Sequence, residues 1–405
     1  MRIVVDVTPL SHPRTGVGNY IRGSLRGLAE AAAGEHEIVA FAPVSMRSRE
    51  RLEQAIDGIP VERRLVTLPP SAHLWRTLWS RVGTPSVERL VGPLDVFHFS
   101  DWMYPRQRAG LRSTMVHDLV PLRHPEWVHP RTRRQSLAKY RHAAGTCDVI
   151  VTNSEFTAKD VAERLDFPRE RIVVAYPGVD ERFSPEGGEA GDYVLMLAPG
   201  DPRKNFSNLA AAVELVPGLR LEAPDQVSDD KLPDLYRNAA VFAYPSYFEG
   251  FGIPILEAMA CGTPVVASAH PSLDEASGDA AVRVDPDSPE SISEGIGLGR
   301  VTSIIETAKV DTAFLIPDEE WVPMIYELLE HEGLCLGGST GVNIAGAIRL
   351  AKQLGTGKTI VTILADSGGR YQSKLFNPEF MRSKKLPVPE WLEKRTNIEV
   401  PFEKV

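Results

Sequence analysis

Residues 248–268 read FEGFGIPILEAMACGTPVVAS and combine a Gly-Phe-Gly turn, a short helical pattern and a β-branched run. Two acids, Glu249 and Glu257, lie eight positions apart in this stretch. Proline is well tolerated in the first turn of a helix, so Pro254 predicts that a helix begins beside it. The run 264–268 predicts a strand. The stretch therefore indicates one turn, helix and strand of a parallel α/β fold.

The same alternation of short apolar runs and helical patterns extends outward over most of the chain, which is typical of parallel α/β proteins. Helices are expected at 18–33 and 155–165, and a Gly-, Pro- and acid-rich linker is expected at 183–192. The fold class predicted is α/β, with two Rossmann-like, doubly wound domains that face a cleft where ligands bind. The expected strands are 2–7, 37–43, 95–100, 113–118, 148–153 and 171–176 before the linker, and 193–198, 219–222, 241–245, 264–268 and 281–284 after it.

Composition narrows the class of protein. The chain has 405 residues, enough for two or three domains, and a formal net charge of -9, which argues against a general nucleic-acid binder. The three cysteines are far apart and form no CxxC pair, so neither a zinc site nor a disulfide framework is expected. No run approaches the roughly 18 apolar residues of a membrane span, and the N-terminus reads as a strand. We expect a cytoplasmic protein.

Two loops after strands are candidates for anion binding. In TGVGNY (15–20), Gly16 and Gly18 permit close backbone approach at the start of a helix, although a plain strand-to-helix turn explains them equally well. In GDPRKN (200–205), Arg203 and Lys204 follow a strand, where they could neutralise a diphosphate without a metal. A solvated basic turn is the alternative for that pair.

The stretch at 248–268 is the more specific candidate. The amides of Phe251, Gly252 and Ile253 would lie at a helix N-terminus and form an anion site. Glu249 and Glu257 flank that site, and carboxylates accept hydrogen bonds from vicinal hydroxyls such as those of a sugar or ribose. A simpler interpretation is that Glu257 only complements the helix dipole, which is worth about 0.3–1 kcal/mol. That interpretation leaves the Gly-Phe-Gly turn unexplained.

Taken together, these motifs resemble retaining glycosyltransferases of family 4, also called glycosyl transferase group 1, which have the GT-B fold. FEGFGIPILEAMACGTPVVAS resembles the Glu-x7-Glu signature of that family. The segments that also match, in order, are TGVGNY, VHDLVPLRHPEW (116–127), VTNSEFTAKDV (151–161), VAYPGVD (174–180) and DPRKN (201–205). The resemblance covers about residues 1–296.

The resemblance implies an acceptor-side domain at 1–187, a donor-binding domain at 188–296, and glycosyl transfer with retention of configuration, without a metal. It implies that Glu249 touches the hydroxyls of the donor sugar and that Glu257 holds the ribose. Arg203 and Lys204 match the diphosphate-binding pair. Gly16 and Gly18 match residues near the diphosphate. His117 matches a histidine beside the donor sugar, and a structural histidine is the alternative.

Two departures from the family pattern are visible. Members of the family have Gly at the position of Ala198, whereas this chain places a glycine at Gly200. In addition, the segment 219–236 is too short for the usual helix and strand, so the donor domain is shortened near 223–229. In a doubly wound sheet the missing strand would be an edge strand, so we expect the domain to fold with a thinned edge.

From about residue 297 the chain resembles the C-terminal segment of cysteine synthase and cystathionine β-synthase, which use pyridoxal phosphate. Ser339, in GGSTG, matches a serine that contacts the cofactor ring in that family. The lysine motif and phosphate loop of the family have no match, so no cofactor is expected. GTGKT (355–359) lacks the first glycine of a phosphate loop, since Lys352 stands there, and reads as a helix-to-strand turn.

The two resemblances meet at 291–300, where composition also changes. Residues 1–290 hold 28 Arg and 4 Lys, and residues 291–405 hold 5 Arg and 8 Lys. We interpret the chain as a chimera: a hexosyl- or mannosyl-type glycosyltransferase joined to an α/β segment of foreign type at 297–405. The foreign tail replaces the family's usual final helix, so impaired activity is one expected consequence.

Several partners and alternatives stay open at this point. The partners expected are a nucleotide sugar and a glycan, lipid or small-molecule acceptor, with no nucleic acid. The segment 129–144 is a basic helix candidate, which indicates either peripheral contact with the inner membrane face or a solvated surface. The alternative functions are a non-catalytic nucleotide-binding scaffold and a degenerate pyridoxal-phosphate protein.

Overall fold

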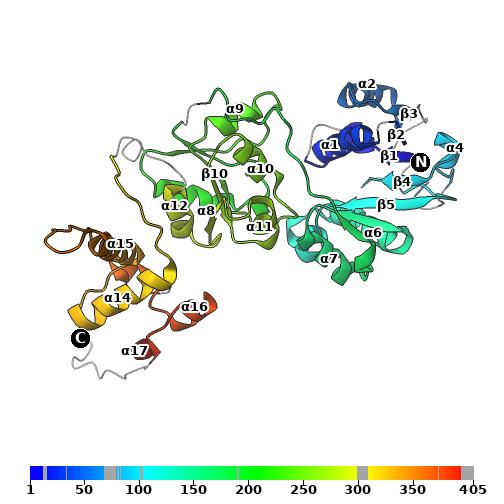
Figure 1. Cartoon of the computed structure of the whole chain (residues 1–405). Coiled ribbons are helices and arrows are strands. Elements are labelled where there is room, and N and C mark those ends of the chain that lie inside the picture. The colour runs from blue at the N-terminus through cyan, green and yellow to red at the C-terminus, as the bar shows by residue number, and fades with distance from the viewer. Residues whose placement is uncertain are drawn as a thin grey trace, which may run out of the picture. The chain divides into compact units, whose positions relative to one another are not determined.

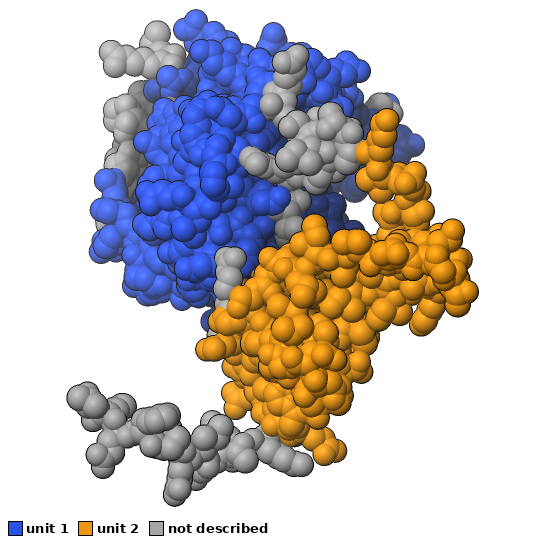
Figure 2. Space-filling model, turned by 90° about the vertical axis from the view of Figure 1, so that its left-hand side faces the viewer, with its two compact units in different colours: residues 1–302 blue, residues 303–405 orange. Residues whose placement is uncertain are grey.

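The computed structural model describes residues 1–11, 16–32, 34–67, 79, 82, 84–100, 104–188, 191–298, 309–372 and 374–393. The chain divides into two compact units, residues 1–302 and residues 303–405, which Figure 2 shows in different colours. The described residues form two sheets, and both belong to unit 1. The described residues of unit 2 form helices. The two units are considered one at a time.

The first sheet of unit 1 has seven parallel strands in the order β3-β2-β1-β4-β5-β6-β7. Helices cover both of its faces (Figure 1), and a separate apolar cluster fills the space on each side. Its strands are β1 (Arg2–Asp6), β2 (Glu37–Val44), β3 (Glu62–Thr67), β4 (Val96–Phe99), β5 (Leu111–Val116), β6 (Val149–Thr152) and β7 (Ile172–Val174). Its helices are η1 (Thr8–Ser11), α1 (Gly16–Ala31), α2 (Met46–Ala55), α4 (Glu88–Val91), α5 (Val120–Arg123), η2 (Pro125–Trp127), α6 (Pro130–Thr146), α7 (Glu155–Leu165) and η3 (Arg169–Arg171).

The second sheet of unit 1 has five parallel strands in the order β12-β11-β10-β8-β9. It is also covered on both faces, with one apolar cluster on each side. Its strands are β8 (Tyr193–Leu195), β9 (Arg220–Glu222), β10 (Val241–Tyr244), β11 (Val265–Ser268) and β12 (Val282–Val284). Its helices are η4 (Pro202–Lys204), α8 (Phe206–Glu214), α9 (Leu232–Arg237), α10 (Ile253–Ala260), α11 (Pro271–Ser277) and α12 (Pro289–Leu298).

The thinned edge expected for this sheet is present. β9 is three residues long and forms the edge next to β8, with no further strand outside it among the described residues. The central strands β8, β10 and β11 are buried along their whole length. The shortening of the sheet at β9 therefore lies outside its buried centre. An edge strand has neighbours on only one side, which is why the domain tolerates its reduction.

Every expected strand of residues 1–296 forms, but one strand of the first sheet was not expected. β3 carries Glu62, Arg63 and Arg64, and only Leu65 in it is fully buried. It pairs with β2 at the sheet edge, where charged residues are common and the apolar alternation is weak. Helix α1 also begins two residues earlier than expected, so Gly16 and Gly18 lie inside its first turn rather than in a loop.

Unit 2 is built on two helices, α14 (Asp318–Glu332) and α15 (Gly338–Leu354), with η5 (Gly368–Tyr371), α16 (Pro378–Ser383) and α17 (Glu390–Glu393). The helices approach closely at Gly341, where a Cβ would lie 2.8 Å from the carbonyl oxygen of Trp321. The fully buried core of this unit is small: Val322, Ile325, Tyr326, Leu375 and Met381.

The strand expected after GTGKT does not form. Helix α15 ends at Leu354, Gly355 caps it with a φ of 73°, and residues 358–366 run without a sheet partner in the part of unit 2 that is described. Only one isolated bridge, Leu336 to Ser367, is present there. A parallel strand needs neighbouring strands to pair with, and the tail does not carry them. Val361 and Ile363 are consequently 88% and 72% exposed.

Candidate active site

The candidate site lies at the C-terminal ends of β8 and β10, which are neighbours in the second sheet. The segment after β8 contains η4, with Arg203 and Lys204 in it. The segment after β10 contains Glu249 and leads into α10. Because parallel strands end at the same edge of a sheet, these side chains come together although they are about 45 positions apart in sequence.

The two glycines of the Gly-Phe-Gly turn have separate structural reasons. A Cβ at Gly250 would lie 2.0 Å from the carbonyl oxygen of His117, so no other residue fits there without a shift of the backbone. Gly252 caps α10 with a φ of 110°, a conformation that favours glycine. Phe251, between them, is buried. The turn thus lets the chain pass close to His117 and then begin a helix at Ile253.

Lys204 and Glu249 form a buried ion pair. The Lys204 Nζ lies 2.7 Å from the Glu249 Oε1, and both side chains are about one tenth exposed. The same ammonium group donates to the hydroxyl of Tyr244 and lies 4.1 Å from the centroid of that ring. A charge-assisted hydrogen bond at low exposure fixes both side chains in position. The pair brings together two residues that the sequence motifs identified separately.

Arg203 is held by acids from both domains of unit 1. Its Nε donates to Asp201 Oδ1 at 3.1 Å and its Nη2 donates to Asp201 Oδ2 at 2.6 Å, and its Nη1 lies 3.6 Å from Asp118 Oδ2. Burial lowers the pKa of Arg203, but the hydrogen bonds to Asp201 and the charges of Glu249 and Asp118 outweigh burial and raise the pKa overall. The guanidinium is therefore a fixed positive charge at this edge of the sheet.

Glu257 is buried in α10 and accepts a hydrogen bond of 3.0 Å from the hydroxyl of Tyr236. Burial raises the pKa of Glu257, while the Tyr236 hydrogen bond and the charge of Arg182 act in the opposite direction. A carboxylate with one partner on a buried tyrosine has remaining acceptor positions for a ligand hydroxyl. Complementing the helix dipole alone would not require this burial.

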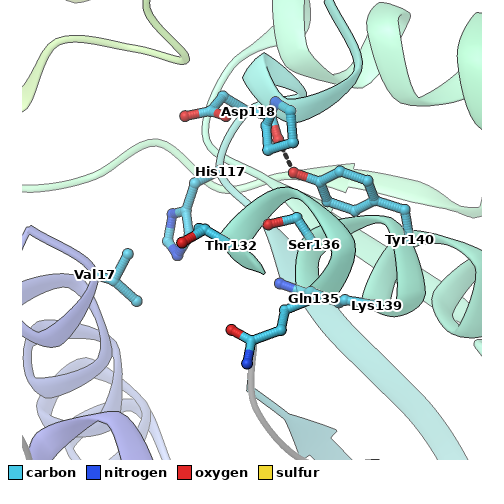
Figure 3. A pocket seen from close by; sticks show the side chains of 9 residues that line it. Val17, His117, Asp118, Thr132, Gln135, Ser136, Lys139 and Tyr140 are labelled. Atoms are coloured by element: carbon cyan, nitrogen blue, oxygen red, sulfur yellow. Dashed lines mark hydrogen bonds between the residues drawn. The ribbon is translucent and has the colours of Figure 1, made fainter. Parts of the chain in front are cut away.

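His117 lies at the junction of several elements. It follows β5, its ring meets Tyr20 of α1 edge-to-face with centroids 5.0 Å apart, and its carbonyl faces Gly250. Figure 3 shows that the side chains of Val17 and His117 line one pocket together with residues of α6. The start of α1, with Gly16 exposed and Gly18 buried, is therefore close to His117. A Cβ at Gly16 would meet no atom within 4 Å, so protein packing does not demand glycine there.

Several hydrogen bonds join the two domains of unit 1 beside this site. The hydroxyls of Ser154 and Thr157 both donate to the carbonyl oxygen of Gly250, at 2.6 and 3.1 Å. Glu275 of α11 accepts from the backbone amides of Glu155 and Phe156 at 2.6 and 2.8 Å and so caps α7 from the other domain. These contacts hold the turn 249–252 against the first domain.

Four residues of the site were missed from the sequence: Asp118, Asp201, Tyr236 and Tyr244. Asp118 follows His117 and Asp201 precedes Pro202 in the quoted motifs. Their position beside motif residues was the signal that could have identified them as part of the site. The tyrosines belong to α9 and β10 and look like ordinary core residues in the sequence. Their hydroxyls reach Glu257 and Lys204 only through the fold.

In the tail, the segment that resembles part of a cofactor site is engaged by Asp366 of the same unit. The carboxylate of Asp366 accepts from the backbone amide and the hydroxyl of Thr340, at 3.2 and 3.1 Å, and thereby occupies the N-terminus of α15. Ser339 is exposed in the first turn of α15.

Comparison with protein families gives three matches. Residues 14–183 match the family described as Glycosyltransferase Family 4, and residues 189–298 match the family described as Glycosyl transferases group 1. Residues 253–366 match the family described as Pyridoxal-phosphate dependent enzyme. The last two matches overlap between 253 and 298, which includes the segment where the two resemblances meet in the sequence.

Individual relatives divide in the same way. The chain is 28% identical over 352 residues to O-antigen chain mannosyltransferase B of Escherichia coli, covering 73% of this chain and 90% of that protein. It is 44% identical over 100 residues to a cysteine synthase of Dictyostelium discoideum, covering 25% of this chain and 26% of that protein. The chain thus spans only about a quarter of that cysteine synthase.

Two solved structures resemble the fold. One is sucrose-phosphate synthase from Thermosynechococcus elongatus, with a TM-score of 0.53 and 17% identity over 76% of this chain and 90% of that one. The other is Anabaena HepE in complex with UDP and glucose, with a TM-score of 0.50 and 17% identity over 73% of this chain and 89% of that one. At this identity they show the fold alone.

Proposed function

The chain joins a GT-B glycosyltransferase of the hexosyl or mannosyl type to a cysteine-synthase-like segment, and we propose how its site residues carry out the transfer. The donor is a nucleotide sugar and the acceptor is a hydroxyl compound of the glycan, lipid or small-molecule class. The transfer proceeds with retention of configuration and without a metal ion. Pyridoxal phosphate has no part in it, because the lysine motif and the phosphate loop of the pyridoxal-phosphate family have no match in the sequence.

The donor is held by the second domain of unit 1. Glu257 accepts hydrogen bonds from the ribose hydroxyls, and Tyr236 keeps its carboxylate in place. Arg203, Lys204 and the amides of Phe251, Gly252 and Ile253 at the start of α10 bind the diphosphate. Glu249 accepts hydrogen bonds from the donor sugar through the oxygen that Lys204 does not engage.

The chemistry needs stabilisation of a leaving nucleoside diphosphate and of an oxocarbenium-like sugar. The bond between the anomeric carbon and the diphosphate oxygen breaks, and its electron pair stays on that oxygen. The acceptor oxygen attacks from the same face, and its proton passes to the departing diphosphate, so no protein nucleophile is required. Arg203 and Lys204 stabilise the developing negative charge because they are already in position. His117 contacts the donor sugar.

The observation that carries this proposal is the buried Lys204–Glu249 pair at the ends of β8 and β10. In this proposal Lys204 is the cation for the phosphates and Glu249 is the acceptor for sugar hydroxyls, and their charged atoms lie 2.7 Å apart shortly before α10 begins. Well-packed apolar residues often stabilise a fold as much as a buried ion pair does, or more. Stability alone therefore does not explain why these two positions carry charges.

Helix α6 has an exposed basic face that bears on where the protein acts. None of the described helices is long and apolar enough to cross a membrane. Arg131, Arg133 and Arg134 are exposed on α6, and we propose that this face contacts an anionic membrane surface from the cytoplasmic side. No role for nucleic acid is proposed.

The test is a calorimetric titration of UDP, GDP and ADP into the full chain, followed by an assay for hydrolysis of the corresponding sugar nucleotides. We expect one nucleotide to bind, and Glu257→Gln to weaken its affinity by about tenfold, because the variant loses charge-assisted hydrogen bonds to the ribose. Glu214→Gln, at the exposed end of α8, is the matched control.

Each other outcome has a defined meaning. Nucleotide binding without turnover of any sugar nucleotide would make the chain a nucleotide-binding scaffold. Absence of binding by all three nucleotides would contradict both the enzyme and the scaffold. Unchanged affinity in Glu257→Gln would show that the ribose assignment is wrong.

A further inference from the structure

Two consecutive carbonyls of the turn 249–252 accept hydrogen bonds from buried hydroxyl groups. The Glu249 carbonyl accepts a bond of 2.8 Å from the hydroxyl of Ser272 in α11, in the second domain. The Gly250 carbonyl accepts from Ser154 and Thr157 in the first domain, at 2.6 and 3.1 Å. All three residues that carry these hydroxyls are at most 1% exposed. Hydrogen bonds at this depth are protected from water, so both peptide units have a fixed orientation.

His270 gives the Ser272 hydroxyl its direction. The His270 Nδ1 lies 2.8 Å from the Ser272 Oγ. A hydroxyl has one proton and a carbonyl can only accept, so Ser272 donates to Glu249 and the Nδ1 of His270 donates to the Ser272 oxygen. The Ser272 amide lies farther from Nδ1, at 3.4 Å, so the hydroxyl contact decides the tautomer. The three residues form a short chain of hydrogen bonds that ends at the Glu249 backbone.

Aromatic side chains hold the His270 ring in place. The ring meets Phe156 of α7 and Phe248 edge-to-face, with centroids 4.8 and 5.3 Å apart. Phe248 is 2% exposed and directly precedes Glu249. Burial lowers the pKa of His270 and outweighs the charge of Glu249, which raises it, so the ring is neutral at pH 7. A neutral ring with its proton on Nδ1 is the form that the hydrogen bond to Ser272 requires.

Glu249 is fixed at both of its ends. Its carboxylate pairs with Lys204 at 2.7 Å, and its carbonyl is held by Ser272 at 2.8 Å. A side chain held at its backbone and at its head group meets a ligand without first reorganising. Since a buried carbonyl needs a donor in any fold, a purely structural Ser272 is the alternative.

We propose that Ser272, oriented by His270, is a positioning residue for sugar transfer, which keeps the carboxylate of Glu249 where the sugar of the bound donor meets it. The inference rests on the proposed function, in which Glu249 accepts hydrogen bonds from that sugar. Its consequence is selective. The Gly250 carbonyl keeps its own two partners when Ser272 is altered, so the amides at the start of α10 stay in place for the diphosphate.

The test compares a nucleoside diphosphate with its sugar nucleotide. Calorimetry on the full chain gives dissociation constants for UDP and UDP-glucose, GDP and GDP-mannose, and ADP and ADP-glucose. For the pair that binds, we expect Ser272→Ala to weaken the sugar nucleotide about fivefold, the effect of one hydrogen bond, and to leave the nucleoside diphosphate unchanged within about twofold. Hydrolysis at saturating sugar nucleotide should also slow, because a misplaced Glu249 affects the bound donor, so kcat changes as well as KM.

Ser277→Ala is the matched control. Ser277 lies in the same helix, is 8% exposed and donates to the carbonyl of Leu273 at 2.8 Å. The control therefore removes a buried hydroxyl of α11 whose carbonyl partner lies in that helix, and it should bind both ligands like the wild type. Unchanged affinity of Ser272→Ala for the nucleoside diphosphate also shows that the second domain is folded.

A second pair of variants isolates the part of His270. His270→Asn and His270→Leu both lose the ring contacts with Phe156 and Phe248, but only asparagine has a nitrogen that can donate to Ser272 from a similar position. We expect His270→Asn to bind the sugar nucleotide more tightly than His270→Leu, with equal affinities for the nucleoside diphosphate.

Four results would overturn the proposal in whole or in part. Equal weakening of both ligands in Ser272→Ala would make Ser272 structural only, and wild-type binding and turnover in that variant would leave it no role. The same selective loss in Ser277→Ala would show that the effect is not specific to Glu249. Equal affinities of the two His270 variants would remove the part assigned to His270. Failure of the proposed function is a distinct result, since the wild type then binds no nucleotide, and it removes this inference as well.

Discussion

Ala198 has a backbone φ of 55°, in the left-handed region that residues with a Cβ rarely adopt. From the resemblance to family 4 glycosyltransferases we expect glycine at this position, whereas the nearby Gly200 does not have a positive φ. The strain lies directly before η4, which carries Arg203 and Lys204. A residue with a Cβ therefore holds the left-handed conformation in the loop that leads to these two side chains.

We expect Ala198→Gly to raise the free energy of unfolding of unit 1 by about 0.5–1 kcal/mol. The left-handed conformation costs an L-residue about 1–2 kcal/mol, and part of that gain is lost to the greater freedom of glycine in the unfolded chain. Urea denaturation followed by circular dichroism measures it. Gly200→Ala is the control, because a Cβ there meets only Asp225, at 3.6 Å. A destabilised Ala198→Gly protein would contradict the strain argument.

Gly250→Ala should disrupt the contact between the two domains of unit 1. The added Cβ would lie 2.0 Å from the His117 carbonyl oxygen, a clash that the backbone can relieve only by moving apart. Overpacking of this kind costs about 1–3 kcal/mol, and we expect sugar transfer to fall with it. Gly145→Ala, in open space on α6, should leave transfer unchanged. Denaturation midpoints measure the loss of stability, and initial rates measure the loss of sugar transfer. Unchanged values of both in Gly250→Ala would contradict this prediction.

The buried Glu257 should make stability depend on pH. Burial raises the folded pKa of Glu257 above its ordinary value of about 4.5, so the native state holds the proton more tightly than the unfolded state does. The contribution of this group to stability is therefore greatest below pH 4.5 and is lost as pH rises through the folded pKa. Glu257→Gln lacks that loss, so its stability relative to wild type should increase with pH across this window.

Denaturant titrations from pH 4 to 7 measure the difference, with Glu214→Gln as the control for the change of charge on the exposed end of α8. A constant difference between Glu257→Gln and wild type over this range would show that burial does not penalise the carboxylate. Raised stability together with weaker nucleotide binding would identify Glu257 as a residue kept for ligand binding at the expense of the fold.

At the scale of elements, the N-terminus of α7 is capped by an acid from the other domain. Glu275 of α11 accepts from two amides of α7 and from the hydroxyl of Tyr176 at 3.1 Å. A carboxylate at a helix N-terminus gains from both the free amides and the helix dipole. The pairing joins the two sheets of unit 1 without any part of the tail.

Glu275→Ala should therefore speed hydrogen exchange at the amides of Glu155 and Phe156 by about tenfold or more, since hydrogen bonds to charged groups are worth about 1.5–3 kcal/mol. Glu163→Ala, near the other end of α7, removes only an exposed pair to Lys159 at 3.9 Å and serves as the control. Unchanged exchange in Glu275→Ala would show that other contacts hold α7.

Periodicity and caps predicted most elements of unit 1, and they failed where pairing decides the structure. The bounds expected for α7 agree with those observed, because Ser154 supplies a strong N-cap before a regular helical pattern. β3 gave no such signal, since an edge strand can carry Glu62, Arg63 and Arg64 on its open side. Likewise, the motifs identified Lys204 and Glu249, but only the fold shows that they touch.

At the scale of the whole molecule, the tail shows most clearly what local sequence cannot decide. The run TIVTILA at 359–365 is rich in β-branched residues and reads as a strand, yet it has no strand to pair with in the described chain. The chain matches only about a quarter of a cysteine synthase, so the remainder of that fold is not present in the match. Strand propensity is realised only when neighbouring strands exist.

This run should promote self-association of the protein. It is uncharged, apolar and exposed, features typical of segments that pair between copies. We expect Val361→Lys combined with Ile363→Lys to shift the chain toward monomer in sedimentation at high concentration. Ala351→Lys combined with Gln353→Lys, both at exposed positions of α15, is the control for two added positive side chains elsewhere in unit 2. An unchanged distribution of sizes in the double variant would contradict this expectation.

The exposed course of residues 358–366 also makes this segment a candidate site for proteolysis. Proteases bind their substrates in extended form, and this segment presents an exposed Lys358 just after Gly357, which has a φ of 79°. A cut there separates α15 from α16 and splits the small core of unit 2, because Leu375 and Met381 pack against Val322 and Ile325 from the far side of the cut. Unit 1 keeps its own four apolar clusters after such a cut. We therefore expect limited trypsin digestion to cut at Lys358 and to leave unit 1 folded after unit 2 has come apart.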